Sequence, residues 1–275
     1  MTESDIRLSF FLGIFTVVML WEFFACKRKL NTNKSKRWFN NIALVALDTL
    51  IVRLLLPAGA VGIALWADES NFGLLHLVSL PVPVAIILSV IILDLVIYWQ
   101  HRMFHQVPLL WRLHQVHHAD RDIDVTTALR FHPIEILISM LIKFAAVLLI
   151  GAPALAVVFF EVVLNGMAMF NHGNIRLPKA WDALLRIVLV TPDMHRVHHS
   201  VLPHETNSNY GFNISLWDKL FSSYHAQPDA GHDGMTIGLN QYQHQPTDAL
   251  LWMLRLPLNS AAMTYAKNNQ GGNHE

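Results

Sequence analysis

Histidine is the residue that sets this sequence apart: sixteen occur in 275 residues, and eight of them fall into three short motifs. The first motif is an H-x-x-x-H pair, and the other two share the spacing H-x-x-H-H. Neutral imidazole is a ligand for zinc, copper, iron and nickel, and positions i, i+3 and i+4 share one helical face. We therefore expect each H-x-x-H-H motif to present three imidazoles to one point. The eight candidate ligands are His101, His105, His114, His117, His118, His195, His198 and His199.

Eight imidazoles are more than one metal ion needs. A single four-coordinate zinc ion would use half of them, whereas two metal ions with open positions, which oxygen chemistry requires, would use them all. A lone histidine near a membrane helix is usually an interfacial polar residue, but repetition and spacing together favour metal ligands. The sequence lacks the H-E-x-x-H motif of zinc metalloproteases and the Glu-x-x-His ligands of soluble di-iron bundles, and its one cysteine, Cys26, excludes a Cys-rich zinc site.

The composition indicates that these histidines belong to an integral membrane protein. Hydrophobic residues make up 53% of the chain and charged residues only 15%, against about 25% charged in an average soluble domain. The mean hydropathy of +0.36 agrees. The 20 basic and 20 acidic residues cancel, so nothing in the charge suggests a nucleic-acid partner.

Apolar segments of about 20 residues, long enough to span a bilayer, define the expected organisation. Two further segments form a helical hairpin, and residues 249–256 form an amphipathic interfacial helix started by Thr247 or Asp248. The predicted fold is all-α, with about four transmembrane or hairpin helices and a cytoplasmic histidine-rich cap. We expect one membrane domain, 1–275, made of three N-terminal spans in 1–99 (8–26, 42–66 and 80–99), histidine motifs in 100–133, a hairpin at 134–170, a cap with the third motif at 171–265, and a disordered tail at 266–275.

The distribution of basic residues predicts the orientation. The loop 27–40 carries six basic residues, whereas the loop 67–73 carries none. By the positive-inside rule, the first loop is cytoplasmic and the N-terminus lies outside. Counting spans from there places all three histidine motifs on the cytoplasmic side.

Beyond the motifs themselves, the segment from Asp94 to Tyr224 resembles the fatty acid hydroxylase/sterol desaturase superfamily of membrane di-iron oxygenases. The resemblance is carried by DLVIYWQHRMFH, LWRLHQVHH, TTALRFHPIE, FNHGNIRLP, TPDMHRVHHS and ETNSNYGFNISLWDKLFSSYH. It implies a multi-pass enzyme that uses two iron ions and O₂ to hydroxylate or desaturate a bilayer lipid. Electrons would come from a separate donor, either cytochrome b5-like or a ferredoxin-type reductase.

The resemblance also implies roles for single residues. The eight motif histidines match the family's ligands, and His172, in FNHGN, matches a further family histidine, although the second histidine that some members have nearby is absent. Four more residues are expected to orient a ligand or contact the substrate. Asp94 and Tyr98 lie on the helical stripe of His101, while His132 precedes Glu135 by one turn and has a structural role as its alternative. The fourth is Asp193, two residues before the third motif.

Hydroxylation is the favoured reaction, with desaturation at the same site as the alternative. Two other classes fit less well. A metal transporter needs ligands along a transmembrane path, whereas these ligands cluster at one face. A haem electron carrier would place lone histidines within the apolar spans, and a Soret band in purified protein would identify it.

Overall fold

The computed structural model describes residues 3–259, and within that range every regular element is a helix. Five segments are long and apolar enough to cross a membrane. The predicted all-α multi-pass fold is therefore confirmed, with five candidate spans instead of about four, because each arm of the hairpin is long enough by itself. The predicted disordered tail lies outside the described residues. The candidate spans are Glu3–Phe24 (α1), Lys34–Leu77 (containing α2 and α3), Val82–Gln106 (α4), Pro133–Ile150 (α6) and Ala154–His172 (α7).

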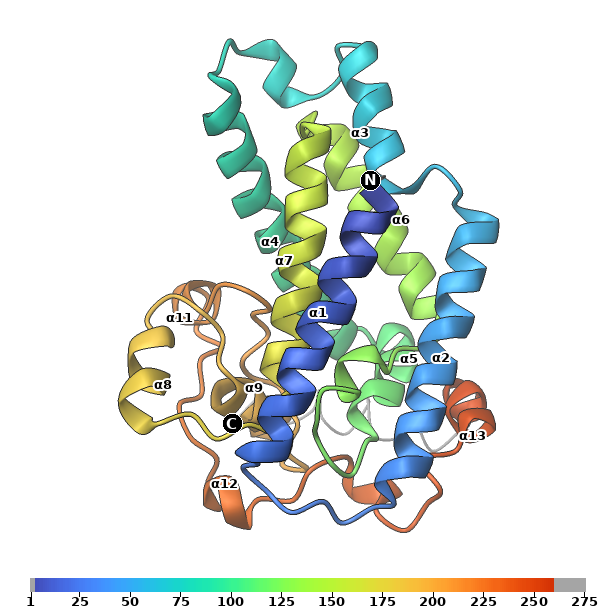
Figure 1. Ribbon diagram of the computed structural model, residues 1–275, viewed down its shortest axis with the longest axis vertical. Coiled ribbons are helices and arrows are strands. Elements are labelled where there is room, and N and C mark those ends of the chain that lie inside the picture. Colours follow the sequence, from blue (N-terminus) through green and yellow to red (C-terminus); the bar gives the residue numbers. More distant parts are fainter. Residues whose placement is uncertain (1–2, 260–275) are drawn as a thin grey trace.

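Short helices pack against one end of this bundle and form the cap (Figure 1). Residues of the basic loop that follows α1 contact the cap directly: Lys27 pairs with Asp193 at 3.1 Å, and the backbone N–H of Asn31 donates to Asp122. The loop and the histidine motifs therefore share one end of the molecule, as predicted. The cap elements are α5 (Pro108–His118), α8 (Lys179–Leu185), α9 (Pro192–His198), α10 (Pro203–Thr206), α11 (Leu216–Leu220), α12 (Gly231–Gly234), α13 (Leu250–Arg255) and the 3₁₀ turns η2 (Thr127–Leu129), η3 (Asn240–Tyr242) and η4 (Leu256–Leu258).

The predicted second span is broken into two helices. α2 (Lys34–Leu55) begins where the side chain of Asn33 accepts from the N–H of Lys36. It ends before Pro57, since proline lacks an N–H and disfavours helical geometry in the residue before it. α3 (Gly59–Glu69) follows, and η1 (Leu74–Leu77) leads to α4. Leu56, Pro57 and Ala58 at this break line a cavity inside the bundle.

The hairpin predicted at 134–170 is present as α6 and α7, with its turn at the end of the bundle far from the cap. Gly151 ends α6 with φ +69°, the left-handed conformation that glycine supplies at helix C-termini. A side chain could not replace the hydrogen at Gly73 either, since a Cβ there would lie 2.3 Å from the Gly151 nitrogen. This close contact ties the α3–α4 connection to the hairpin turn.

One helix start differs from the prediction. The terminal amphipathic helix is present as α13, but its N-cap is Ala249 and no side chain caps it. Thr247 and Asp248 are used elsewhere: the Thr247 carbonyl accepts from Arg130 at 2.6 Å, and Asp248 pairs with Lys36 at 3.2 Å. These contacts join the residues before α13 to α2 and to Arg130, and no side chain caps the helix.

Candidate metal centre

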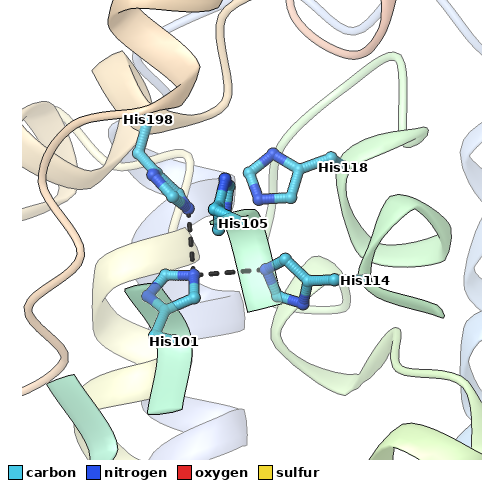
Figure 2. Close-up of side chains that lie close together, drawn as sticks. All are labelled: His101, His105, His114, His118 and His198. Carbon is cyan, nitrogen blue, oxygen red and sulfur yellow. Dashed lines mark hydrogen bonds between the residues drawn. The ribbon is translucent and has the colours of Figure 1, made fainter. Parts of the chain in front are cut away.

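The nine predicted histidines all lie at the junction of bundle and cap, and they form two adjacent groups. Within each group the ligand nitrogens lie within 4.8 Å of one another. None of the nine side chains is more than 8% exposed. The first group, drawn in Figure 2, is His101, His105, His114, His118 and His198; the second group is His117, His172, His195 and His199.

The grouping corrects one expectation, because neither H-x-x-H-H motif presents three imidazoles to one point. In α5, His114 and His118 join the first group while His117 joins the second. In the third motif, at the end of α9, the assignment is reversed. His195 and His199 join the second group, and His198 joins the first. Residues i and i+4 lie nearly above one another on a helix, whereas i+3 is rotated to the other side of that line. Each motif therefore serves both groups.

Four helices bring the histidines together. α4 supplies His101 and His105 from its last turns, and Pro108 starts α5 immediately afterwards in a new direction. α7 ends at His172. α9 is fixed at its start by Thr191, whose hydroxyl accepts from the N–H of Met194 and donates to Asp182 at 2.6 Å. Membrane helices thus supply three of the nine ligand candidates, and the cap supplies the other six.

Most of the imidazole rings are oriented through Nδ1. A carbonyl or carboxylate oxygen can only accept, so each Nδ1 that faces one carries the hydrogen, and its Nε2 carries the lone pair. The partners are the backbone oxygens of Tyr210 for His101 (2.8 Å), Ser208 for His198 (2.6 Å), Ala168 for His172 (2.7 Å) and Arg130 for His117 (3.2 Å), and Oε1 of Glu135 for His114 (2.6 Å).

The Nε2 atoms of these oriented rings face one another. Nε2 of His101 lies 3.2 Å from that of His114 and 3.1 Å from that of His198, and His117 and His172 approach to 3.0 Å in the second group. Two lone pairs at this separation repel unless a cation lies between them. Ligands about 2.1 Å from one ion would lie about 3.0–3.4 Å apart. The donor set therefore fits metal ions at both groups.

Burial keeps the cap imidazoles in the form that binds metal. Desolvation lowers the pKa of His114 to about 3 and is the largest cause of the shift. It also lowers the pKa of His117, His118, His198 and His199 well below the ordinary value, with neighbouring imidazoles adding to the effect. A neutral ring is required for coordination, so the site is prepared for cations before any ion arrives.

Four residues were expected to orient a ligand or contact the substrate. Two of them, Tyr98 and Asp94, lie beside the centre and form no hydrogen bond with a ligand ring. The Tyr98 hydroxyl lies 2.8 Å from Oγ of Ser223. Asp94 accepts from Nε1 of Trp217 at 2.8 Å and so holds the cap against α4.

The other two of the four, His132 and Asp193, also form no hydrogen bond with a ligand ring. His132 caps α6 by accepting from the N–H of Ile134, as in its structural alternative, and its Nε2 lies 3.3 Å from the carbonyl oxygen of Leu254. Asp193 pairs with Arg196 and Lys27.

Sequence reasoning missed two residues that contact ligand rings. Glu135 was considered only as a partner of His132, yet it accepts from His114. Asn207 places its Oδ1 3.4 Å from Nδ1 of His105. A carboxylate in the first turn of a membrane helix is itself a signal of function, and it could have identified Glu135. Nothing local distinguishes Asn207 from other loop asparagines.

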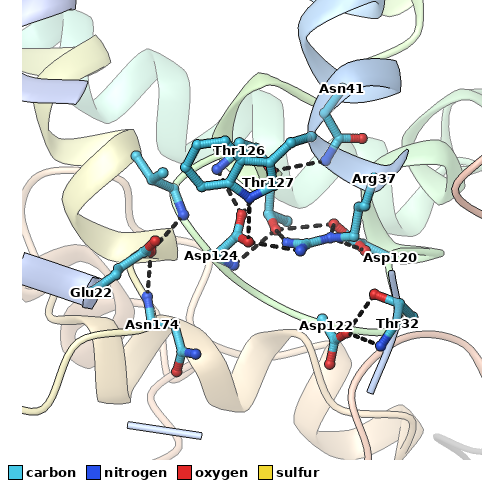
Figure 3. Close-up of polar contacts among 12 residues, drawn as sticks. Glu22, Thr32, Arg37, Asn41, Asp120, Asp122, Asp124, Thr126, Thr127 and Asn174 are labelled. Atoms are coloured by element: carbon cyan, nitrogen blue, oxygen red, sulfur yellow. Dashed lines mark hydrogen bonds and ion pairs between the residues drawn. The ribbon is translucent and has the colours of Figure 1, made fainter. Parts of the chain in front are cut away.

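A buried polar network holds the segment between α5 and α6 in place (Figure 3). Arg37 is fully buried and pairs with Asp120 at 2.9 Å and with Asp124 at 2.7 Å. Glu22, near the end of α1, accepts from the backbone N–H groups of Val125 and Asn174. These contacts join α1 and α2 to the segment that follows α5, and so fix the direction of the second motif.

A cavity of about 640 Å³ reaches from the first histidine group into the bundle. His101 and His114 line its inner end. Phe104, Phe131 and Leu129 lie nearby, and the far end reaches the first turns of α1 and the end of α2. Such a chamber, largely apolar with a few polar groups, suits an organic ligand.

Comparison with known proteins matches residues 86–223 to the family model described as fatty acid hydroxylase. The chain is 30% identical over 148 residues to an ornithine lipid hydroxylase, OlsE, of Rhizobium tropici, covering 54% of this chain and 44% of that protein. It is 29% identical to the alkylglycerol monooxygenase of Homo sapiens (53% and 32% covered) and 26% identical to the human lathosterol oxidase (57% and 48% covered). The match thus spans less than half the length of these relatives. No solved structure matches the chain.

Proposed function

Because this chain belongs to the fatty acid hydroxylase family, we propose that it is an O₂-dependent membrane oxidoreductase that hydroxylates an unactivated C–H bond of a lipid with two iron ions. The observation that carries the proposal is the set of Nε2 lone pairs turned toward one another within each group, at His101 and His114 and again at His117 and His172. Neutral imidazole nitrogens gathered in this way require cations between them.

The first histidine group would hold one iron ion and the second group the other. Iron bound there supplies the redox chemistry with O₂ that breaks an unactivated C–H bond. The protein's own groups hold the ligand rings: carbonyl oxygens of Tyr210 and Ser208 fix two rings, and the Glu135 carboxylate fixes His114. Burial of all nine histidines excludes water from the reaction.

A lipid would reach the centre through the cavity in the bundle. The relatives are named for an ornithine lipid, for alkylglycerols and for a sterol, so membrane lipids are the substrate class proposed for this chain. Desaturation remains the alternative, since one oxidising site can either add oxygen to a carbon or remove a second hydrogen. The proposed division of the chain into three N-terminal spans, hairpin and cap assigns binding to the bundle and most ligands to the cap.

Electrons would come from a separate cytochrome b5-like protein or ferredoxin-type reductase in the cytoplasm. That source requires the cap to face the cytoplasm, as proposed from the basic loop 27–40. The rival classes receive less support. Among residues 3–259, the ligand candidates gather at one end of the bundle and form no series of sites along a path for a transporter. A haem carrier would not need nine converging imidazoles.

Metal analysis joined to lipid analysis tests the proposal. Purified protein should contain two iron ions per chain, and cells that express it should accumulate lipids carrying an added oxygen atom that is labelled when ¹⁸O₂ is supplied. Unlabelled lipids with one more double bond would favour the desaturase instead. One tightly held zinc ion per chain and unchanged lipids would contradict both. A matched variant, His101→Ala, should lose the product.

A further inference from the structure

Among residues 3–259, the buried carboxyl groups of the membrane helices have partners in every case but one. Glu22 accepts two backbone N–H groups, Glu161 pairs with Arg7 and Lys143, Asp94 accepts from Trp217, and Glu135 accepts from His114. Asp48 has no hydrogen-bonding or ion-pair partner among residues 3–259, although it is only 4% exposed. Leaving a buried carboxyl group unsatisfied costs free energy, so its retention calls for a partner that the chain does not supply.

The position of Asp48 indicates what that partner is. It lies on α2, which packs against α6, and it lines the same cavity as His101 and His114. Two further acceptor atoms of cavity-lining residues are also unsatisfied: Oε1 of Gln100 and Oε2 of Glu135. No side chain or backbone group within residues 3–259 donates to these three acceptors. A ligand that brings hydrogen-bond donors would satisfy them.

We propose that Asp48, assisted by Gln100, binds a hydroxyl or ammonium group of the lipid, so that the substrate is an amphiphile oxidised close to its polar end. This inference rests on the proposed lipid oxidation. Glu135 accepts from His114 of the first group, and Asp48 lines the same cavity from α2, which packs against α6. A donor bound to Asp48 would therefore bring nearby carbons to the metal centre. The tail then lies along Val52, Met140 and Leu164, farther from the histidines.

Three other charged groups of the cavity lie in ion pairs and do not compete for this role. Arg7, Lys143 and Glu161 form a closed ion-pair cluster, in which Glu161 takes one contact from each cation, at 2.5 Å and 3.1 Å. Their donors and acceptors are already satisfied by one another. The cluster joins α1, α6 and α7, and it lies two turns of α6 beyond Glu135, toward the far end of the cavity.

A matched pair of probes tests the inference without turnover. 1-Decanol and 1-methoxynonane are isomers, but only the alcohol donates a hydrogen bond. We expect purified wild-type protein to bind the alcohol about 3- to 10-fold more tightly than the ether, since one hydrogen bond between neutral groups contributes at this level. Asp48→Leu should remove that preference and leave ether binding unchanged. Leu54→Ala, a lipid-facing change on the same helix, should retain it.

Stability separates binding from a structural role. Removing an unsatisfied carboxyl should keep or raise the thermal midpoint of Asp48→Leu, and iron content should stay at the wild-type level. Asp48→Asn, which keeps an acceptor, should retain part of the preference for the alcohol. Equal binding of the two probes by wild-type protein, or failure of both variants to fold, would overturn the inference. If iron or oxygenated product is absent while the probe preference persists, the proposed reaction is wrong but the binding site stands.

Discussion

His117 and His118 are neighbours in the chain, yet their imidazoles belong to different ligand groups. The same holds for His198 and His199 in the third motif. Consecutive residues on a helix project about 100° apart, so a helix end that lies between two metal ions can supply both. The repeated H-x-x-H-H motif therefore indicates two helix ends, each of which lies between the two histidine groups and contributes to both.

Alanine variants of these neighbours should separate the two groups. His117→Ala should lower iron mainly in the second group and His118→Ala mainly in the first, and both should abolish lipid oxidation because the reaction needs both ions. Iron per folded chain and product by mass spectrometry are the measurements. His244→Ala, an exposed histidine of the cap, is the control and should match wild type. Full iron and normal turnover in either test variant would contradict a shared two-ion site.

Glu135→Gln should weaken metal retention without unfolding the protein. The carboxylate accepts from Nδ1 of His114 at 2.6 Å, which fixes the ring and makes its Nε2 a better donor. Loss of such a partner typically costs about 10–100-fold in metal affinity or activity. Iron retention during titration with a chelator measures the effect, and Asp233→Asn, at an exposed carboxylate of the cap, should show none. A chelator midpoint identical to wild type would exclude this role.

Arg37→Leu should destabilise the protein strongly. The guanidinium is fully buried against Asp120 and Asp124, and removing one member of a buried ion pair leaves uncompensated charge, at a cost of about 3–5 kcal/mol. A lower thermal midpoint and reduced folded yield are expected. Lys29→Leu removes an exposed basic residue from the neighbouring loop and should change stability little. Equal midpoints for the two variants would show that the network is dispensable.

Acid should destabilise the metal-free protein below neutral pH. In the unfolded chain histidine has a pKa of about 6.5, whereas burial lowers the pKa of folded His114 to about 3. Between these values the unfolded chain binds protons that the folded chain does not, so stability falls as pH decreases through this window. Other buried cap histidines shift in the same direction and steepen the loss. Thermal midpoints of iron-free protein across this range measure it; a flat profile would contradict neutral buried imidazoles.

The orientation can be tested by cysteine labelling in a Cys26→Ser background. Lys179→Cys, at an exposed position of the cap, should react with a membrane-impermeant thiol reagent only after cell lysis. Asp68→Cys, exposed at the opposite end of the bundle, should react in intact cells. The reverse pattern would place the cap outside and remove its access to a cytoplasmic electron donor.

Local chemistry was enough to determine much of this protein from its sequence. The length of the apolar segments gave the spans, Gly151 and Pro153 gave the hairpin turn, and histidine spacing identified eight of the nine ligand candidates. The ninth, His172, came from the resemblance to the family. These features depend on interactions within one or two helical turns or on the bilayer thickness, and both can be read from neighbouring residues.

Only the tertiary structure decided how the histidines divide between two groups, because that depends on where four helix ends meet. Two other contacts also depend on how distant segments pack. Glu135 contacts His114 across 21 positions of sequence, and Asp248 pairs with Lys36 instead of capping α13. The same dependence explains Asp48, whose lack of a partner appears only when every neighbouring helix is in place. A side chain's partner is set by packing between distant segments, and the identity of the residue does not contain that information.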